Sequence, residues 1–311
     1  MKRGFLLGKK SSTATAPAQK QPAPPPSTSS AVVPLHLPST SSFPKTPQDS
    51  TTLHWTFHPS TEPSLALHAT TATLSALHHS VPFFSSTSSV PPSLPSFAPL
   101  YDLADFPGKG KGLVASADIA PNSLVLLDRP LLVFAPEAIP RQHQNAVLSH
   151  ALSRLSKDAQ KNFMALSNAF ANVEGAYLGR TSTNAFPIVS LSDLPPSANA
   201  DAVTYTGVFP LAARLNHSCA ANCRFEWSAK EWALSVRTNR EVRKGEELMV
   251  SYVVPFQKRR ERREELRVKY RFECQCEWCS LSDEESAKKD IEREKLAEEF
   301  MKQWSAQKGQ G

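Results

Sequence analysis

Five cysteines and one short polar segment hold most of the residues in this sequence that could do chemistry. The cysteines all lie between Cys219 and Cys279, and the last three form a C-x-C-x-x-C run. We expect no secretory signal, because the start MKRGFLLGKK has only a very short apolar stretch. In a reducing compartment, cysteines spaced this closely indicate metal ligands before disulfides.

The polar segment is Asn216-His217-Ser218-Cys219, with Asn222 three positions after its end. Further along, the chain contains GEELMVSY, which ends at Tyr252, and then the cysteine run. In this order the motifs resemble the SET domain with its post-SET cysteines. The resemblance covers about residues 99–280. It is nearest to SMYD-type and fungal SET proteins, whose pattern the phrases FPLAARLNHSC and RRERREELRVKYRFECQCEWC follow closely.

The resemblance implies a mostly β fold of small curved sheets with a helical insertion, in which the NHSC segment and the segment ending at Tyr252 cross as a pseudoknot. It also implies a protein-lysine N-methyltransferase that uses S-adenosyl-L-methionine, with cofactor and lysine entering a narrow channel from opposite faces. Residues 97–257 would form the SET domain and residues 258–280 a basic helix with the post-SET zinc knuckle. Residues 281–311 would form a C-terminal helix.

The same resemblance assigns the site residues. Tyr252 and Tyr270 are the catalytic candidates, and Tyr205 is a weaker candidate for the channel. For Asn184, the competing interpretation is an asparagine at a strand start that satisfies its own turn. Asparagine and histidine side chains offer both donors and acceptors to a cofactor. The cofactor-binding candidates are Lys109, Gly110, Lys111, Asn184, Asn216, His217, Tyr252 and Phe272.

One structural zinc is expected. Tetrahedral zinc accepts four thiolates, and a fully ligated site has no open position for catalysis. Fixing the knuckle to the NHSC segment would hold Tyr270 and Phe272 over the channel. Cys223 would remain a small buried apolar residue. The ligands implied by the resemblance are Cys219, Cys274, Cys276 and Cys279.

Tyr252 has the central role in the expected reaction. Methyl transfer from a sulfonium to an amine is an in-line displacement, so the protein must deliver a neutral and aligned amine. A lysine with an ordinary pKa of about 10.4 is mostly protonated at neutral pH, and a desolvating channel beside a positive sulfonium lowers that pKa. The tyrosine hydroxyl would hydrogen-bond the amine and orient its lone pair.

Two departures from the family pattern narrow the expectation. Ala220-Ala221 stands where relatives have an acidic residue and proline, although Asn222 is retained. No cysteine lies between Gly112 and Cys219, so we expect a SET protein without the MYND finger. Since 32 residues follow Cys279, we also expect no C-terminal helical repeat domain of the SMYD kind. Substrates of larger relatives are therefore not transferred.

Hydrophobic patterns predict the elements that position these residues. A glycine loop at 108–112 lacks the preceding strand and following helix of a dinucleotide fingerprint, and residues 112–134 predict two short strands around the turn Ala-Pro-Asn-Ser. Residues 138–170 have helical spacing, and TNAFPIVSL, CRFEWS and EWALSVRTNREV predict strands. Residues 256–271 predict a basic helix. Beyond Cys279, Ser-Asp-Glu-Glu predicts a cap for a terminal helix that offers Ile291, Leu296, Phe300 and Trp304 for docking.

Residues 1–96 differ sharply in composition. The first hundred residues hold 16 of the 26 prolines and carry six Lys/Arg against Asp49 and Glu62, so +4 of the total charge of +6 lies there. We expect a disordered Ser/Thr/Pro-rich tail whose deletion leaves cofactor binding intact. Within it, LALHATTATLSALHHSVPFF is either a transient helix or partner-binding segment, or a more apolar patch of linker.

Charge, apolar runs and the N-terminal residues give a general expectation of the partners and the cellular compartment. The nearly neutral remainder of the chain gives no electrostatic footprint for specific nucleic-acid binding, and no run reaches membrane-spanning length. The start MKRGFLLGKK resembles a SNAG-type peptide of chromatin repressors, but it also fits a mitochondrial transit peptide or a plain basic end. We expect a nuclear or cytoplasmic monomer, with the mitochondrion as the alternative, that acts on a lysine of a histone tail or another protein. The rival hypothesis is a catalytically silent SET module that serves as a chromatin or protein-interaction scaffold.

Overall fold

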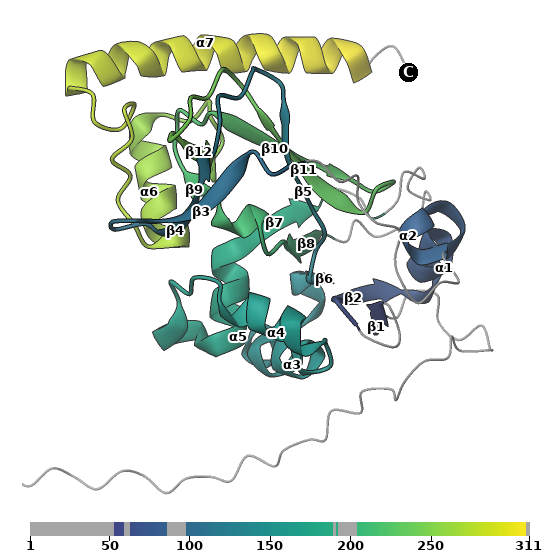
Figure 1. Cartoon of the computed structure of the whole chain (residues 1–311). Helices are drawn as coiled ribbons and strands as arrows, with labels where there is room; N and C mark the ends of the chain where they lie inside the picture. The colour runs from purple at the N-terminus through teal and green to yellow at the C-terminus, as the bar shows by residue number, and fades with distance from the viewer. Residues whose placement is uncertain (1–52, 59–62, 86–97, 189–190, 192–203, 309–311) are drawn as a thin grey trace, which may run out of the picture. The chain divides into compact units, whose positions relative to one another are not determined.

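The computed structural model describes residues 53–58, 63–85, 98–188, 191 and 204–308 (Figure 1). In these residues the strands form three sheets, with the orders β1-β2-β6-β8-β7, β10-β11-β5 and β3-β4-β12-β9. The strands are β1 (Leu53–His58), β2 (Leu65–Thr70), β3 (Tyr101–Phe106), β4 (Gly110–Ala115), β5 (Leu124–Asp128), β6 (Leu132–Phe134), β7 (Ala185–Ile188), β8 (Tyr205–Val208), β9 (Asn216–His217), β10 (Cys223–Ser228), β11 (Ala233–Thr238) and β12 (Glu247–Val250). The helices are α1 (Thr71–Ser80), α2 (Pro82–Ser85), α3 (Arg141–Ser153), α4 (Lys157–Met164), α5 (Ala171–Asn184), α6 (Arg259–Tyr270) and α7 (Asp283–Lys308), with short 3-10 turns η1 (Pro136–Ala138) and η2 (Ala212–Arg214). The expected mostly β fold with a helical insertion is confirmed.

The five-stranded sheet is buried on both faces. Ala66 and Leu132 point toward a core shared with α3, α4 and α5, whereas Leu65, Leu67 and Val133 point into the main core. Strands buried on both faces have nearly continuous apolar sequences, which explains the sequence LVF of β6. Figure 1 shows the three helices of the insertion lying together beside this sheet.

The segment 53–85 corrects the expected disordered tail. Residues 53–58 and 63–85 form β1, β2, α1 and α2, and β2 pairs in parallel with β6. Leu67 and Leu77 are fully buried, and the ring of Phe84 lies 4.6 Å from that of Trp232. Most of the apolar residues of this segment are buried, and they pack against elements that are distant in sequence. The other residues of 1–96 lie outside the described residues.

We therefore expect Leu67→Ala to lower the free energy of unfolding by about 2–5 kcal/mol, because it leaves a cavity in a closed core. Denaturation in urea measures the change. The matched control is Leu103→Ala, since Leu103 is 54% exposed and surface changes stay within about 0.5 kcal/mol. Equal stability of the two variants would contradict the packing of β2. Deletion of residues 1–95, which the sequence suggested would leave cofactor binding intact, should remove this strand and destabilise the fold.

The glycine loop is also different from the expectation. A strand, β3, precedes it, and Gly110–Gly112 belong to β4, so the glycine run forms a hairpin. Gly108 and Gly110 have φ of 74° and 78°, the left-handed region that glycine adopts without strain. The Lys111 ammonium lies 3.2 Å from the carboxylate of Asp105 across this hairpin. Because a strand rather than a helix follows, the exclusion of a dinucleotide fingerprint is retained.

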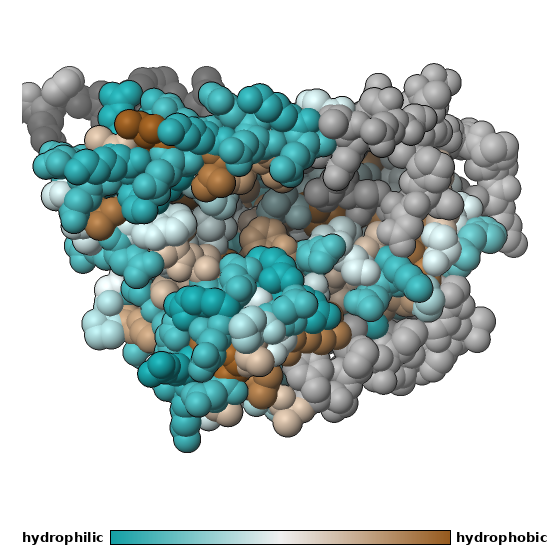
Figure 2. All heavy atoms as spheres, turned by 90° about the horizontal axis from the view of Figure 1, so that it is seen from above, coloured by the Kyte–Doolittle hydropathy of each residue, from teal (hydrophilic) through white to brown (hydrophobic). Residues whose placement is uncertain are grey.

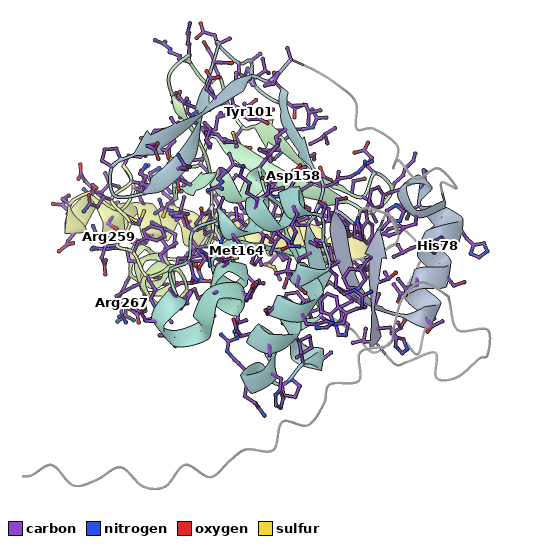
Figure 3. The ribbon with its side chains drawn as sticks, turned by 60° about the horizontal axis from the view of Figure 1, so that its bottom comes forward. His78, Tyr101, Asp158, Met164, Arg259 and Arg267 are labelled. Carbon is purple, nitrogen blue, oxygen red and sulfur yellow. The ribbon has the colours of Figure 1, made fainter. Side chains whose placement is uncertain are left out.

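Helices α6 and α7 form the C-terminal part. The predicted cap of α7 is present, since Ser282 Oγ accepts the Glu285 N–H at 3.3 Å and the Ser282 N–H donates to Glu285 Oε2 at 3.1 Å. Arg259, at the start of α6, lies close to α7 (Figure 3), and its backbone N–H donates to Asp290 at 3.1 Å.

The expected apolar docking face of α7 is largely open to solvent. Ile291, Leu296 and Phe300 are 54%, 53% and 52% exposed, and Phe300 alone of these has a ring contact, with Phe256 at 5.7 Å. The side chain of Trp304 lies outside the described residues. Figure 2 shows a mainly hydrophilic surface with scattered hydrophobic side chains. Among the described helices, none combines the length and apolarity required to cross a membrane.

Candidate functional site

The NHSC segment lies directly beside the segment that ends at Tyr252. Strands β9 and β12 pair in parallel, as the expected crossing of the two motifs requires. Asn222 is fully buried and fastens them. Its Nδ2 donates to the Glu247 backbone oxygen at 2.8 Å, and its Oδ1 accepts the Met249 N–H at 2.8 Å. Two motifs that are distant in sequence therefore meet at one place.

A buried carboxylate, that of Asp128, caps the short turn η2 that precedes the NHSC segment. Asp128 ends β5, and its Oδ2 accepts the N–H groups of Leu211 at 2.7 Å and Ala212 at 2.8 Å. These groups begin η2, whose first N–H groups have no partner within the turn. Burial raises the pKa of Asp128 to about 7, although both N–H groups act to lower it.

We expect Asp128→Asn to keep this cap, since one oxygen accepts both N–H groups, and to gain stability relative to the wild type as pH rises. A raised carboxyl pKa means that the folded state favours the neutral acid. The neutral Asp128 carboxyl contributes its full stabilisation to the wild type below the ordinary pKa of 3.8. The wild type loses this stabilisation as pH rises through about 7. Urea denaturation at about pH 6 and about pH 8 measures the difference. The prediction is contradicted if the difference in the free energy of unfolding between variant and wild type is the same at both pH values. Asp102→Asn, at an exposed aspartate, is the control.

Both ring nitrogens of His217 have partners inside the protein. Nδ1 accepts the Tyr252 N–H at 3.0 Å, which places the ring proton on Nε2, and Nε2 lies 3.3 Å from Cys219 Sγ. Burial lowers the pKa of His217 to about 4, consistent with a neutral ring. The imidazole thus joins Tyr252 to Cys219. Any contact between His217 and a cofactor would use its backbone rather than its side chain.

Aromatic rings gather around Tyr252. Its hydroxyl donates to the Leu215 backbone oxygen at 2.6 Å, and its ring centroid lies 4.9 Å from that of Tyr270 and 5.2 Å from that of His217. The Phe272 ring centroid lies 5.9 Å from that of His217. Burial raises the pKa of the Tyr252 hydroxyl above its ordinary value of 10.0, so the group stays a donor. The predicted channel residues Tyr252, Tyr270 and Phe272 are therefore together.

A carboxylate that sequence reasoning missed, Glu247, joins two of the cofactor candidates. Its Oε2 lies 2.6 Å from Lys109 Nζ, and its Oε1 accepts Asn216 Nδ2 at 2.8 Å. Gly112 packs so closely that a Cβ there would lie 2.7 Å from Asn216 Nδ2. The position therefore requires glycine. The only sequence signal for Glu247 was its place in GEELMVSY.

Two expected residues have other partners. Asn184 is the last residue of α5 rather than a strand start, and its Nδ2 donates at 2.7 Å to the backbone oxygens of Ser167 and Arg180. Tyr205 belongs to the main core and hydrogen-bonds Thr73 of α1. Tyr205 is thus a core residue in contact with the N-terminal segment.

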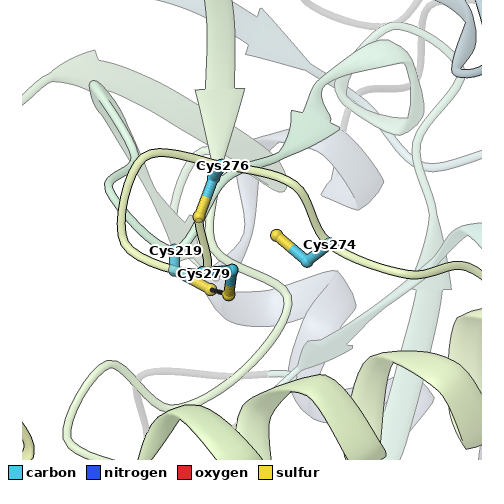
Figure 4. Close-up of side chains that lie close together, drawn as sticks. All are labelled: Cys219, Cys274, Cys276 and Cys279. Atoms are coloured by element: carbon cyan, nitrogen blue, oxygen red, sulfur yellow. Dashed lines mark hydrogen bonds between the residues drawn. The ribbon is translucent and has the colours of Figure 1, made fainter. Parts of the chain in front are cut away.

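Four cysteines converge beside His217. The Sγ atoms of Cys219, Cys274, Cys276 and Cys279 all lie within 4.8 Å of one another (Figure 4). Those of Cys219 and Cys279 are 3.6 Å apart, near the edge of about 3.8 Å that four ligands at about 2.3 Å from a tetrahedral zinc would have. Hydrogen bonds from the neighbouring thiols, that of Cys219 first, lower the pKa of Cys276. The fifth cysteine, Cys223, is 2% exposed in the main core, as predicted.

A buried cation beside the thiols supports a metal there. Arg262 is fully buried, and its Nε and Nη2 have no hydrogen-bond partner among the described residues. It approaches Cys219 closely enough to favour the thiolate. Zinc held by four thiolates carries net negative charge, and free guanidinium N–H groups next to such a centre are well matched to it. The residues therefore fit a zinc ion. From the sequence pattern, Arg262 is only one of the basic residues of the helix predicted at 256–271.

Residues 110–253 match the family model described as SET domain, and the fold of these residues is that of the SET-domain class. Within that class, the chain is similar to fungal set5 and to SMYD proteins. It is 27% identical over 199 residues to "Histone-lysine N-methyltransferase set5" of Schizosaccharomyces pombe, which is 64% of this chain and 56% of that protein.

Two mammalian relatives match over shorter regions. "Histone-lysine N-methyltransferase SMYD3" of Mus musculus is 38% identical over 80 residues, 26% of this chain and 18% of its own length. "N-lysine methyltransferase SMYD2" of Homo sapiens is 33% identical over 88 residues, 28% and 20% of the two lengths. The SMYD-like and fungal SET assignment made from the motifs is confirmed. The match spans about half of the fungal relative and about a fifth of each SMYD protein.

Proposed function

We propose that this protein transfers a methyl group from S-adenosyl-L-methionine to a lysine side chain of another protein. The observation that carries the proposal is the partly buried Tyr252, whose ring lies between those of Tyr270 and His217, directly beside the NHSC segment. The names of the relatives, which describe lysine methyltransferases, support it. The rings of Tyr252, Tyr270 and Phe272 together form what we call the aromatic wall. A catalytically silent module would need neither the Tyr252 hydroxyl nor this wall.

Lys109, Asn216 and Glu247 would hold the cofactor, together with the Gly110 backbone. Lys109 offers a cation to a carboxylate, and Glu247 and Asn216 offer acceptors to an ammonium or an adenine amine. The open space at Gly110 leaves room for a ligand against the backbone. Lys111, Asn184 and Phe272 remain further candidates, and His217 would contribute its backbone.

When bound, the cofactor supplies an electrophilic methyl group on a sulfonium. The chain's own residues prepare the amine that receives it. The rings of Tyr252, Tyr270 and Phe272 exclude water, which lowers the pKa of a lysine held between them. The Tyr252 hydroxyl, fixed by Leu215, orients the amine toward the methyl group. The work of this site is therefore desolvation and alignment.

Zinc would have a structural role at the four cysteines. It would join the loop after α6 to Cys219, and thereby fix Phe272 against His217. The proposal includes the substrate and the location. The protein would act as a monomer, in the nucleus or the cytoplasm, on a lysine of a histone tail or of another protein.

Incubation of the protein with radiolabelled S-adenosyl-L-methionine, histones and a cell extract tests the proposal. We expect label on a protein band and, after digestion, on lysine. The decisive control is Tyr252→Phe, which should remove most of the label. Absence of label from every protein, with cofactor binding demonstrated by calorimetry, would replace the enzyme with the scaffold hypothesis.

A further inference from the structure

A cavity of about 460 Å³ lies between the helical insertion and the end of α6. Its walls come from α3, α5, β6, β8 and α6. Phe134, Phe170, Leu178 and Val268 make much of the wall apolar. The guanidinium of Arg271 lies 5.1 Å from the Phe170 ring and so joins the end of α6 to the insertion. A cavity of this size accommodates a side chain with its attached backbone.

The cavity begins where the aromatic wall around Tyr252 ends. Tyr270 lines the cavity, its ring lies 4.9 Å from the Tyr252 ring, and its hydroxyl lies 3.4 Å from the Tyr252 backbone oxygen. One extended residue advances the chain by about 3.3–3.6 Å. A residue one or two positions from a lysine held at Tyr252 would therefore reach the cavity.

Two buried oxygens in the cavity wall have no partner among the described residues. Gln144 is 5% exposed, and its Nε2 donates to the backbone oxygens of Pro136 at 2.7 Å and Ile139 at 2.8 Å, which leaves Oε1 as the unpaired end. Thr206 Oγ1 is the second such oxygen. An unsatisfied buried group costs about 1–3 kcal/mol. Each is an acceptor that a ligand with hydrogen-bond donors would satisfy.

The cavity also contains a nearly buried carboxylate. The Glu174 side chain is 12% exposed and accepts a hydrogen bond from Ser182 Oγ at 2.5 Å, whereas its ion-pair partner Arg141 is 64% exposed. Only the Arg141 side of this pair is exposed, so the guanidinium can return to solvent when it leaves the carboxylate. A cation from a ligand could therefore replace Arg141 at Glu174.

The backbone holds Glu174 in place. Gly175, the next residue, kinks α5 with φ 81° and ψ −167°, a conformation essentially restricted to glycine. Asn145 Oδ1 closes the kink by accepting the N–H groups of Tyr177 and Leu178, each at 3.1 Å. Lys269 is the other cation in the wall, and its ammonium is already paired with Glu265 at 2.6 Å.

We propose that this cavity binds an arginine side chain one or two residues from the target lysine, so that the substrate is a basic protein segment. The inference rests on the proposed function. Arginine fits because its planar guanidinium presents five N–H donors in a fixed fork that suits the Glu174 carboxylate, and its remaining donors can serve Gln144 Oε1 or Thr206 Oγ1. The long methylene stem packs on the apolar wall.

A peptide library with one fixed lysine tests this, with alanine, arginine, glutamate or leucine at each neighbouring position. We expect the wild type to prefer arginine over alanine at least tenfold in kcat/KM at one position next to the lysine. Glu174→Gln should remove that preference, and Arg141→Gln should increase it, because the competing cation is gone. Glu137→Gln, an exposed carboxylate in η1, is the control and should leave the preference unchanged.

Thr206→Val separates recognition from folding. It removes an unpaired oxygen at constant shape, so the free energy of unfolding should be unchanged or higher while the arginine preference falls. Fluorescence anisotropy of the same peptides gives the comparison without any transfer, so a chain that transfers nothing still decides the matter. Equal binding of arginine and alanine peptides by the wild type and all variants would overturn the inference, whereas binding without transfer would count only against the proposed function.

Discussion

Replacing Tyr252 with phenylalanine is expected to lower methyl transfer by about one to three orders of magnitude, while cofactor affinity changes little. Oriented hydrogen bonds in closed active sites have effects of this size when one is removed. The phenylalanine ring preserves the contacts with Tyr270 and His217. Only the hydroxyl is lost, and with it the group that orients the amine. Single-turnover rates and calorimetric titration with S-adenosylhomocysteine measure the two quantities separately.

The structure adds one complication that the experiment must control. The Tyr252 hydroxyl also donates to the Leu215 oxygen, so its removal leaves a backbone acceptor without this partner and costs about 1–3 kcal/mol of stability. Tyr270→Phe is the matched control, since its hydroxyl makes only a long contact of 3.4 Å. Unfolding curves of both variants establish that each is folded at the assay temperature. A Tyr252→Phe protein with wild-type rates would remove the hydroxyl from the mechanism.

Asn216→Ala provides the opposite pattern. Its amide joins Glu247, which in turn pairs with Lys109, so the change should weaken cofactor binding before it affects the aligned amine. A variant with weaker S-adenosylhomocysteine binding but near-normal transfer at saturating cofactor would separate binding from alignment. If both variants lost affinity and rate equally, the division of roles between the two residues would fail.

The sequence alone located the centre of the site because its motifs are contiguous. The NHSC segment, the strand before Tyr252 and the cysteine run each contain several diagnostic neighbours, so their order was enough to predict that they meet. Strand β10 was equally predictable from CRFEWS, whose residues alternate across one sheet. The four Sγ atoms then assemble as expected.

The parts that were mispredicted depend on distant partners. β2 has a Ser/Thr/His-rich surrounding that indicates disorder by composition, yet β6 and the main core bury it. Likewise, β3 contains two aspartates and an exposed Leu103, and becomes a strand only by pairing with the glycine run of β4. Local propensity has no information about such pairings. Tertiary contacts decide them.

Glu247 and Arg262 were missed for a related reason. Glu247 is one of two adjacent glutamates, and only the register of β12 beside β4 turns it toward Lys109. Arg262 lies in a helix with many exposed charges, and a sequence pattern does not distinguish the one that is fully buried. Charged residues are rarely buried unless they have a partner. A burial prediction for each arginine of α6 would have been the informative signal.

Cys276→Ser is expected to abolish binding of a single zinc ion and to lower the free energy of unfolding by at least about 3 kcal/mol, a fraction of the about 10–16 kcal/mol that structural zinc contributes in small zinc domains. The loop after α6 has little else to fix it, since its small core consists of Val253, Leu266 and three of the cysteines. Loss of the metal should therefore release Phe272 from His217 as well. Zinc content by mass spectrometry and urea denaturation measure the two effects.

Cys223→Ser is the matched control for this experiment. The substitution is identical, but Cys223 lies in the main core, so it should lower stability modestly and leave one zinc per chain. Arg262→Leu should fall between the two variants, because it keeps all four thiolates but removes the buried cation beside Cys219. A chelator that is too weak to remove zinc from the wild type should therefore remove it from Arg262→Leu. Zinc retained by Cys276→Ser, or lost from Cys223→Ser, would show that the ligand set is wrong.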